Sequence, residues 1–264
     1  MSMDAIYLDG ISLLGPGLPD WEEAVAILCG DKPAELAPVT VTAPALLPAT
    51  ERRRAGTSIK LSMAVGLAAA EAAGIDPGGL ANVFTSSGGD CENCHHLLDA
   101  LASSERMISP TRFHNSVHNA AAGYWSIATH CEAASTSLSA YDASFGAGLI
   151  EAAGQVLTSG APCLLIAFDT AYPEPLFALR PVPFPFGVGL VLSPTRGAHS
   201  MATLGLSLTR DPADTLSEPP LEQLRREIPT ARALPLLQRL AGGGAGRVVL
   251  DYLDDTRLAI EVGG

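Results

Sequence analysis

The sequence has one stretch, residues 139–144, where a reactive side chain could stand at a tight turn. Small residues alternate with a period of two before it, and a segment rich in Ala and Gly follows it. These patterns predict a strand over 134–141 that feeds a helix over 142–157. A side chain at such a turn lies at a helix N-terminus, where backbone N–H groups favour developing negative charge. Asp142 and Ser144 are therefore candidate chemical groups, although Asp142 also suits a plain helix N-cap.

The residues of this turn match the nucleophile turn of hydrolases only in part. Residues 142–146 come close to the G-x-S-x-G pattern of nucleophile turns but lack its first glycine. A hydrolase would also need an acid and a histidine later in the chain, and His199 is the only histidine there. A stand-alone acyl-transfer or hydrolytic enzyme that uses Ser144 or Asp142 is therefore kept as an alternative.

Cys91 and Cys94 form a C-x-x-C pair that His95 and His96 follow. The spacing matches both haem c attachment, which needs export, and the start of a thiol redox helix. No second ligand pair follows at the spacing of a zinc site, and adjacent histidines on a helix point in different directions. A redox protein that uses Cys91 and Cys94 is a second alternative, and we expect no metal and no cofactor.

The elements expected around the turn alternate between strand and helix. Strands are expected over 5–11, 82–87, 134–141, 163–168, 187–192, 204–208, 248–253 and 257–262, and helices from 21 and over 58–73, 90–102, 119–128, 142–157 and 221–227. Residues 31–50 and 173–185 are rich in proline and are expected to be irregular, and Ser109 and Pro110 are expected to open a loop. This order predicts an α/β fold.

Three ordered features give the chain a resemblance to the ketosynthases of the thiolase fold. They are Ser109-Pro110, Asn119 and Ala122-Gly123 at the ketosynthase spacing, then the strand over 134–141 with its turn and helix, then the apolar strand over 163–168. Residues 108–169 can be laid on the ketosynthase pattern without a gap, and a weaker likeness covers most of residues 1–210. The resemblance implies the N-terminal half of a thiolase-like fold, with a mixed central sheet packed by helices.

The resemblance also implies that this chain does not condense acyl groups by itself. Asp142 occupies the position of the catalytic cysteine, and a carboxylate cannot form the acyl thioester that a ketosynthase needs. Ketosynthases take two histidines from their C-terminal half, which this chain lacks, whereas His114, His118 and His130 all precede the turn. The nucleophile-equivalent position is therefore not expected to be catalytic.

Among ketosynthases, the chain most resembles the short chain-length-factor-like proteins of aryl polyene pathways. Such a subunit pairs with a full-length β-ketoacyl synthase of polyketide- or fatty-acid-like biosynthesis and shapes the acyl cavity across the heterodimer interface. The implied partners are that ketosynthase and, through the complex, an acyl carrier protein. The implied interface strand comprises Ala134, Ser135, Thr136, Ser137, Leu138, Ser139 and Ala140, and the candidates for lining the acyl cavity are Phe113, His114, Tyr124 and Trp125.

Length and composition agree with a soluble protein that has a substantial core. The chain has 264 residues, 47% of them hydrophobic, and we expect a ketosynthase-like unit over 1–210 and a packed addition over 211–264. Mean hydropathy is +0.25, yet no apolar run approaches the roughly 18 residues of a membrane helix. The first four residues do not resemble a signal peptide, so we expect a cytoplasmic protein whose five cysteines are reduced.

Charge excludes one class of partner and leaves one local question open. The formal net charge of −12 argues against a protein that binds the nucleic-acid backbone. Arg52, Arg53 and Arg54 precede the helix expected over 58–73, and such arginines are more often solvated or ion-paired than part of a phosphate site. A contact with an acidic carrier protein is the alternative for them.

Overall fold

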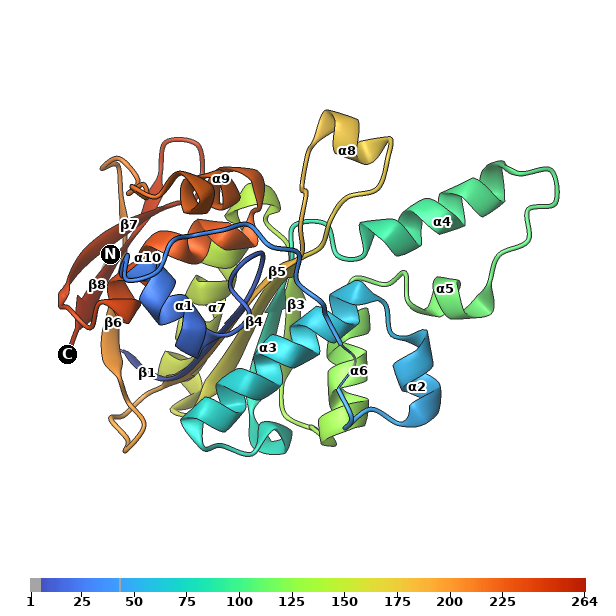
Figure 1. Ribbon diagram of the computed structural model, residues 1–264. Helices are drawn as coiled ribbons and strands as arrows, with labels where there is room; N and C mark the ends of the chain where they lie inside the picture. Colours follow the sequence, from blue (N-terminus) through green and yellow to red (C-terminus); the bar gives the residue numbers. More distant parts are fainter. Residues whose placement is uncertain (1–5, 43) are drawn as a thin grey trace.

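The computed structural model describes residues 6–42 and 44–264, in which eight strands form one mixed sheet with helices on both faces (Figure 1). The strand order is β3-β2-β4-β5-β1-β6-β8-β7. The expected α/β fold is confirmed. The strand expected over 5–11 is β1, although Ala5 and the residues before it lie outside the described part.

The bounds of the elements follow the expected order closely. The strands are β1 (Ile6–Leu14), β2 (Ala81–Thr85), β3 (Ser135–Leu138), β4 (Cys163–Asp169), β5 (Phe186–Ser193), β6 (Ala202–Thr209), β7 (Gly246–Asp251) and β8 (Arg257–Gly263). The helices are α1 (Trp21–Leu28), α2 (Ala49–Arg54), α3 (Thr57–Ala73), α4 (Cys91–Ala102), α5 (Pro110–His114), α6 (Ala120–Thr129), α7 (Ser144–Ser159), α8 (Leu176–Leu179), α9 (Pro219–Glu227) and α10 (Leu234–Ala241). Short 3-10 turns span Pro77–Gly79, Tyr141–Ala143 and Thr230–Ala233.

The parallel part of the sheet sets the position of the 139–144 turn. Strand β2 pairs in parallel with β3 on one side and with β4 on the other. Helices cover both faces of β4, so every one of its residues is buried. This burial on both faces explains its continuous apolar sequence. The carboxyl ends of β2, β3 and β4 therefore meet at one end of the sheet, and the turn that follows β3 lies there.

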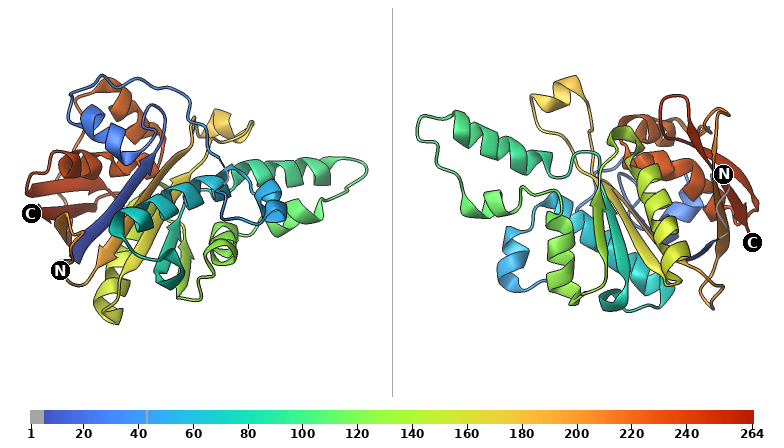
Figure 2. Two further views of the ribbon diagram at one scale, coloured as in Figure 1. Left: turned by 60° about the horizontal axis from the view of Figure 1, so that its bottom comes forward. Right: turned by 180° about the vertical axis from the view of Figure 1, so that it is seen from behind.

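Two hydrophobic layers hold the helices against the sheet (Figure 2). On one face, α3 and α6 pack through small and aliphatic residues, and Gly74 ends α3 in a left-handed conformation with φ of 66°. On the other face lie α1, α7, α9 and α10. Helix α7 can approach the sheet closely because Gly148 has no side chain, and a Cβ at this position would lie 2.6 Å from Thr85 Cγ2.

Several local expectations need correction. Ser109 and Pro110 do not open a loop but begin the short helix α5, which the Ser109 hydroxyl caps by accepting a hydrogen bond from the Arg112 amide. The strand expected over 134–141 ends at Leu138, because the chain then enters a 3-10 turn and α7 begins only at Ser144. The connector over 173–185 holds one helical turn, α8.

The residues after Asp211 continue the same sheet. Strand β8 pairs with β6 over seven residues, and β7 pairs with β8 at the sheet edge. Leu221, Leu224 and Leu237 of α9 and α10 are buried in the core that α1 and α7 also share. Helix α10 was not expected from the sequence. The division of the chain at residue 210 stays a prediction.

One long segment leaves the body of the molecule. Helices α4 and α5 and their connection, residues 91–114, project beyond the end of the sheet and are called the arm below (Figures 1 and 2). Among the described helices, none combines the length and the hydrophobicity that crossing a lipid bilayer requires.

Candidate functional site

The turn over 139–144, called the elbow below, is closed by the hydroxyl of Ser144. Its Oγ accepts a hydrogen bond from the Ala140 amide at 3.0 Å and donates one to the Tyr141 carbonyl at 2.7 Å. Ser144 is fully buried. The hydrolase alternative requires this hydroxyl as a nucleophile. The hydroxyl is instead hydrogen-bonded to the backbone of the turn and is not exposed to solvent.

Tyr141 stands at the tip of the elbow in a strained conformation. Its φ is 53°, in the left-handed region that bulky residues rarely adopt, and the residue is 62% exposed. Nucleophile turns hold their reactive residue on such a sharp strand-to-helix turn. The backbone therefore favours Tyr141, one residue before Asp142, as the residue at the nucleophile-equivalent position. Neither residue has a thiol.

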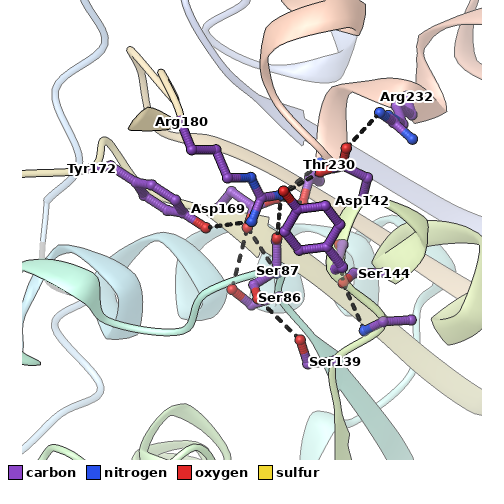
Figure 3. Close-up of polar contacts among 12 residues, drawn as sticks. Ser86, Ser87, Ser139, Asp142, Ser144, Asp169, Tyr172, Arg180, Thr230 and Arg232 are labelled. Atoms are coloured by element: carbon purple, nitrogen blue, oxygen red, sulfur yellow. Dashed lines mark hydrogen bonds and ion pairs between the residues drawn. The ribbon is translucent and has the colours of Figure 1, made fainter. Parts of the chain in front are cut away.

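Asp142 does not cap the helix, so its expected role as an N-cap is wrong. The N-cap residue of α7 is Ala143, and no side chain bonds the first turn. The Asp142 carboxylate instead accepts hydrogen bonds from two guanidinium groups, those of Arg180 and Arg232, the latter at 2.9 Å (Figure 3). Arg232 comes from the 3-10 turn after α9, so this carboxylate ties the C-terminal segment to the elbow.

Arg180 covers the elbow from the connector between β4 and β5. Its guanidinium carbon lies 3.7 Å from the centre of the Tyr141 ring, in the geometry of a cation–π contact. The same group donates to the Ser87 hydroxyl at 2.8 Å and to the Tyr172 hydroxyl at 3.3 Å. Arg180 thus fills the space above Tyr141 with a charged group that four neighbours hold in place (Figure 3).

Replacing Asp142 with Ala should destabilise the fold, since it leaves two partly buried guanidinium groups without their carboxylate. The side chains of Arg180 and Arg232 are 20% and 22% exposed, so solvent screening reduces the penalty to about 1–2 kcal/mol. Asp255→Ala is the matched control, because the Asp255–Arg210 pair is mostly exposed. Urea unfolding of both variants measures the difference, and equal losses would show that the Asp142 cluster contributes nothing beyond a surface pair.

A second carboxylate, Asp169, lies behind the elbow at the end of β4. It is 1% exposed and accepts hydrogen bonds from the Ser87 amide at 2.9 Å, the Thr230 amide at 2.9 Å and the Thr230 hydroxyl at 2.7 Å. Burial raises the pKa of Asp169, and the hydrogen bonds from Thr230 and Ser87 oppose that rise. Asp169 therefore joins the end of β2, the end of β4 and the C-terminal segment beneath the elbow.

The candidates for an acyl cavity separate into two groups. Phe113, His114 and Tyr124 line one pocket of about 680 Å³ between α5 and α6. Trp125 does not join them, because it is fully buried in the core under α3 and its ring packs edge-on against Phe84 at 6.1 Å. The structure thus brings together three of the four residues.

The expected interface strand lies at an open edge of the sheet. Strand β3 is the last strand at its side and pairs only with β2 among the described strands. The carbonyls of Ala134 and Leu138 accept hydrogen bonds from the amides of Asn82, in β2, and Ser86, the residue after it. Because alternate residues of a parallel strand bond to the same neighbour, the N–H and C=O groups of Ser135 and Ser137 face the open edge.

The cysteine pair has the wrong electrostatics for a reactive thiol. Burial raises the pKa of Cys91 to about 11, and burial with the nearby Asp90 raises that of Cys94. Reactive redox cysteines need a lowered thiol pKa, so the redox alternative loses support. Residues 6–42 and 44–264 contain no group of three or more His, Cys, Asp or Glu side chains placed to hold a metal ion.

Comparisons with known proteins agree with this geometry. The profile of the family "Beta-ketoacyl synthase, N-terminal domain" matches residues 21–246. A chain from the complex of the ketosynthase ApeO with its chain length factor ApeC, from Xenorhabdus doucetiae, is 25% identical with a TM-score of 0.74, and the match covers 98% of this chain and 100% of that one. Among curated proteins, none matches the sequence.

Two further solved structures support the fold alone, because their identities are low. A chain from the complex AntDE:AntF, a type II polyketide carrier protein with its ketosynthase, is 11% identical, covers 99% of this chain and 100% of its own, and has a TM-score of 0.77. A chain of the ishigamide ketosynthase/chain length factor is 13% identical, with coverage of 98% and 99% and a TM-score of 0.68. The thiolase-like ketosynthase resemblance is confirmed, and this chain belongs to the β-ketoacyl synthase N-terminal domain family.

Proposed function

We propose that this chain is a non-catalytic, chain-length-factor-like partner of a full-length β-ketoacyl–carrier protein synthase. The observation that carries the proposal is the elbow. The position that needs a thiol is occupied by Tyr141 or Asp142, and the Arg180 guanidinium lies against the Tyr141 ring and bonds the Asp142 carboxylate. Neither a phenol nor a carboxylate can form the acyl thioester that a condensing cysteine forms. The chemistry therefore falls to the partner subunit.

The open edge of β3 supports the pairing part of the proposal. An exposed edge with free Ser135 and Ser137 backbone groups favours addition of a strand from another chain. The arm lies at this same end of the molecule and exposes large apolar side chains, which would be costly to leave in water. They are Leu98, Leu101, Met107, Ile108 and Phe113. In the proposed complex, β3 and the arm form one continuous contact with the ketosynthase.

The pocket beside the arm supports the part that concerns chain length. Phe113, His114 and Tyr124 line a mostly apolar space that a partner chain could close into a cavity. The proposed substrates are carrier-bound polyketide chains of the aryl polyene or a related fatty-acid-like type, delivered by an acyl carrier protein. The similarity to a chain from the complex between ApeO and its chain length factor supports the pairing with a ketosynthase on which this choice rests. The cytoplasmic location expected from the sequence belongs to the same proposal.

The isolated chain should take up no acyl group. Incubation with an acylated carrier protein, followed by intact-mass analysis and peptide mapping of the elbow, should show unmodified Tyr141, Asp142 and Ser144. A full-length ketosynthase with its cysteine serves as the positive control in the same assay. Stoichiometric acylation of an elbow residue, lost in the Ser144→Ala or Tyr141→Phe variant, would replace the partner proposal by a stand-alone acyl-transfer enzyme.

A further inference from the structure

A basic pocket opens where the arm leaves the body, away from the elbow. Its volume is about 520 Å³, and four cationic side chains line it: Arg53, Arg54, Lys60 and Arg112. They come from α2, α3 and α5, which lie beside one another at the base of the arm (Figure 1). The whole chain has only 16 lysines and arginines against 28 acidic residues, so a quarter of its cations gather at this one place.

Most of these cations lack a counter-ion within the protein. Arg54 pairs with Glu51 at 3.2 Å, but Arg53, Lys60 and Arg112 form no ion pair with any residue in 6–42 or 44–264. Both outcomes agree with the sequence-based expectation of a solvated or ion-paired helix entrance, because Arg54 is ion-paired and Arg53 is exposed to solvent. Like charges from separate segments repel one another across a shared pocket, and a bound anion relieves that repulsion.

Two acidic residues also line the pocket, and they differ in their availability. The Asp90 carboxylate accepts hydrogen bonds from the Ser58 hydroxyl at 2.8 Å and the Asn93 amide at 2.9 Å, so the protein itself already uses it. Glu92, in the first turn of α4, is exposed to solvent. The positive charge of the four cations thus exceeds the negative charge of the walls.

The neutral groups of the pocket suit a phosphate oxygen. Helix α3 begins here at Thr57, and no side chain caps its N-terminus. Ser109 and Thr111 add hydroxyl groups from the arm side. Phosphate groups in proteins are commonly bound by this set of hydrogen-bond donors: guanidinium groups, an ammonium group, hydroxyls and the free amides of a helix N-terminus. A carboxylate ligand would use fewer of these donors, because it has two acceptor oxygens where a phosphate has three.

We propose that this pocket binds a phosphate-bearing small molecule, with Arg53, Lys60 and Arg112 as its cationic ligands. The bound phosphate joins the arm to α2 and α3, since Arg112 belongs to the arm and the other two cations to the body. The inference does not depend on the proposed partner role, because the pocket is lined entirely by this chain.

The test is calorimetric titration of the full chain with pyrophosphate and, separately, with inorganic phosphate at constant ionic strength. The matched variants are Lys60→Gln with Arg112→Gln, and Arg196→Gln, which removes an exposed arginine that forms no ion pair with any described residue. We expect one saturable site that the double variant weakens at least tenfold and that Arg196→Gln leaves unchanged. Citrate, titrated in parallel, separates phosphate recognition from general attraction of anions.

Three results would overturn the proposal. They are no saturable binding at millimolar pyrophosphate, equal weakening by Arg196→Gln, and citrate binding as tight as pyrophosphate. If thermal melting without ligand shows that the double variant is misfolded, the single variants Lys60→Gln and Arg53→Gln replace it, and each should weaken binding severalfold.

Discussion

Ser137→Pro should weaken the pairing of this chain with its ketosynthase partner roughly 100-fold, whereas Ser137→Ala should leave the pairing intact. The N–H of Ser137 faces the open edge of β3, so proline removes a donor that β2 does not use. Proline also puts a ring where the partner strand would approach. Losing one or two edge hydrogen bonds together with this clash costs about 3 kcal/mol, which weakens the complex roughly 100-fold.

Ser137→Ala is a sharp control, because it keeps the backbone donor and removes only the hydroxyl. Thermal melting of the two isolated variants should be alike, since the β2 side of the ladder is untouched. Dissociation constants from biolayer interferometry then compare wild type, Ser137→Ala and Ser137→Pro. If the proline variant binds as tightly as wild type, β3 is not the interface strand, even where a complex still forms.

Asp169→Ala should cause the largest loss of stability of any substitution at the site. The change leaves the buried Thr230 amide and the partly buried Ser87 amide without an acceptor and frees the Thr230 hydroxyl. Each buried unsatisfied group costs about 1–3 kcal/mol, so a total near 3 kcal/mol is expected. Asp31→Ala, at an exposed carboxylate, should change the free energy of unfolding by less than about 0.5 kcal/mol.

The pH dependence gives a second readout for the same residue. Because burial raises the pKa of Asp169 in the folded state above its ordinary 3.8, the folded protein retains this proton to higher pH than the unfolded chain. The proton-linked contribution of Asp169 to stability is therefore fully present below pH 3.8 and is lost as the pH rises through the folded pKa, while its hydrogen bonds from Ser87 and Thr230 remain. Asp169→Asn removes this titration, so its unfolding free energy should fall less than that of wild type over the same rise. Parallel curves would contradict the raised pKa.

The strands and helices that carry the elbow could be predicted because their patterns are local. The alternation over 135–138, the apolar run of β4 and the capping residues Asp20 and Asp90 each act within a few residues. The residue at which the strand ends and the elbow begins could not be predicted in this way. The sequence gives no sign that Ala140 and Tyr141 leave the strand, since the hydrogen bonds of Ser144 that close the turn form only in the folded chain.

The residues that surround the elbow could not be found from the sequence, because they come from distant segments. Arg180 lies in a proline-rich connector, and Arg232 follows a helix in the C-terminal segment. Asp169 is the last residue of an apolar strand, and a carboxylate in that place is the one signal that could have directed attention to it. For Asp142 the sequence favours helix capping, because that role needs no distant partner, whereas the two arginines that bond its carboxylate are 38 and 90 residues away.

The most direct test of the partner role is coexpression of this chain with the full-length ketosynthases of the same genome, followed by native mass spectrometry. The account predicts a stable complex with one copy of this chain and one of a ketosynthase, in which only the ketosynthase becomes acylated. A monomer or self-dimer of this chain, with no ketosynthase bound in any combination, would contradict it.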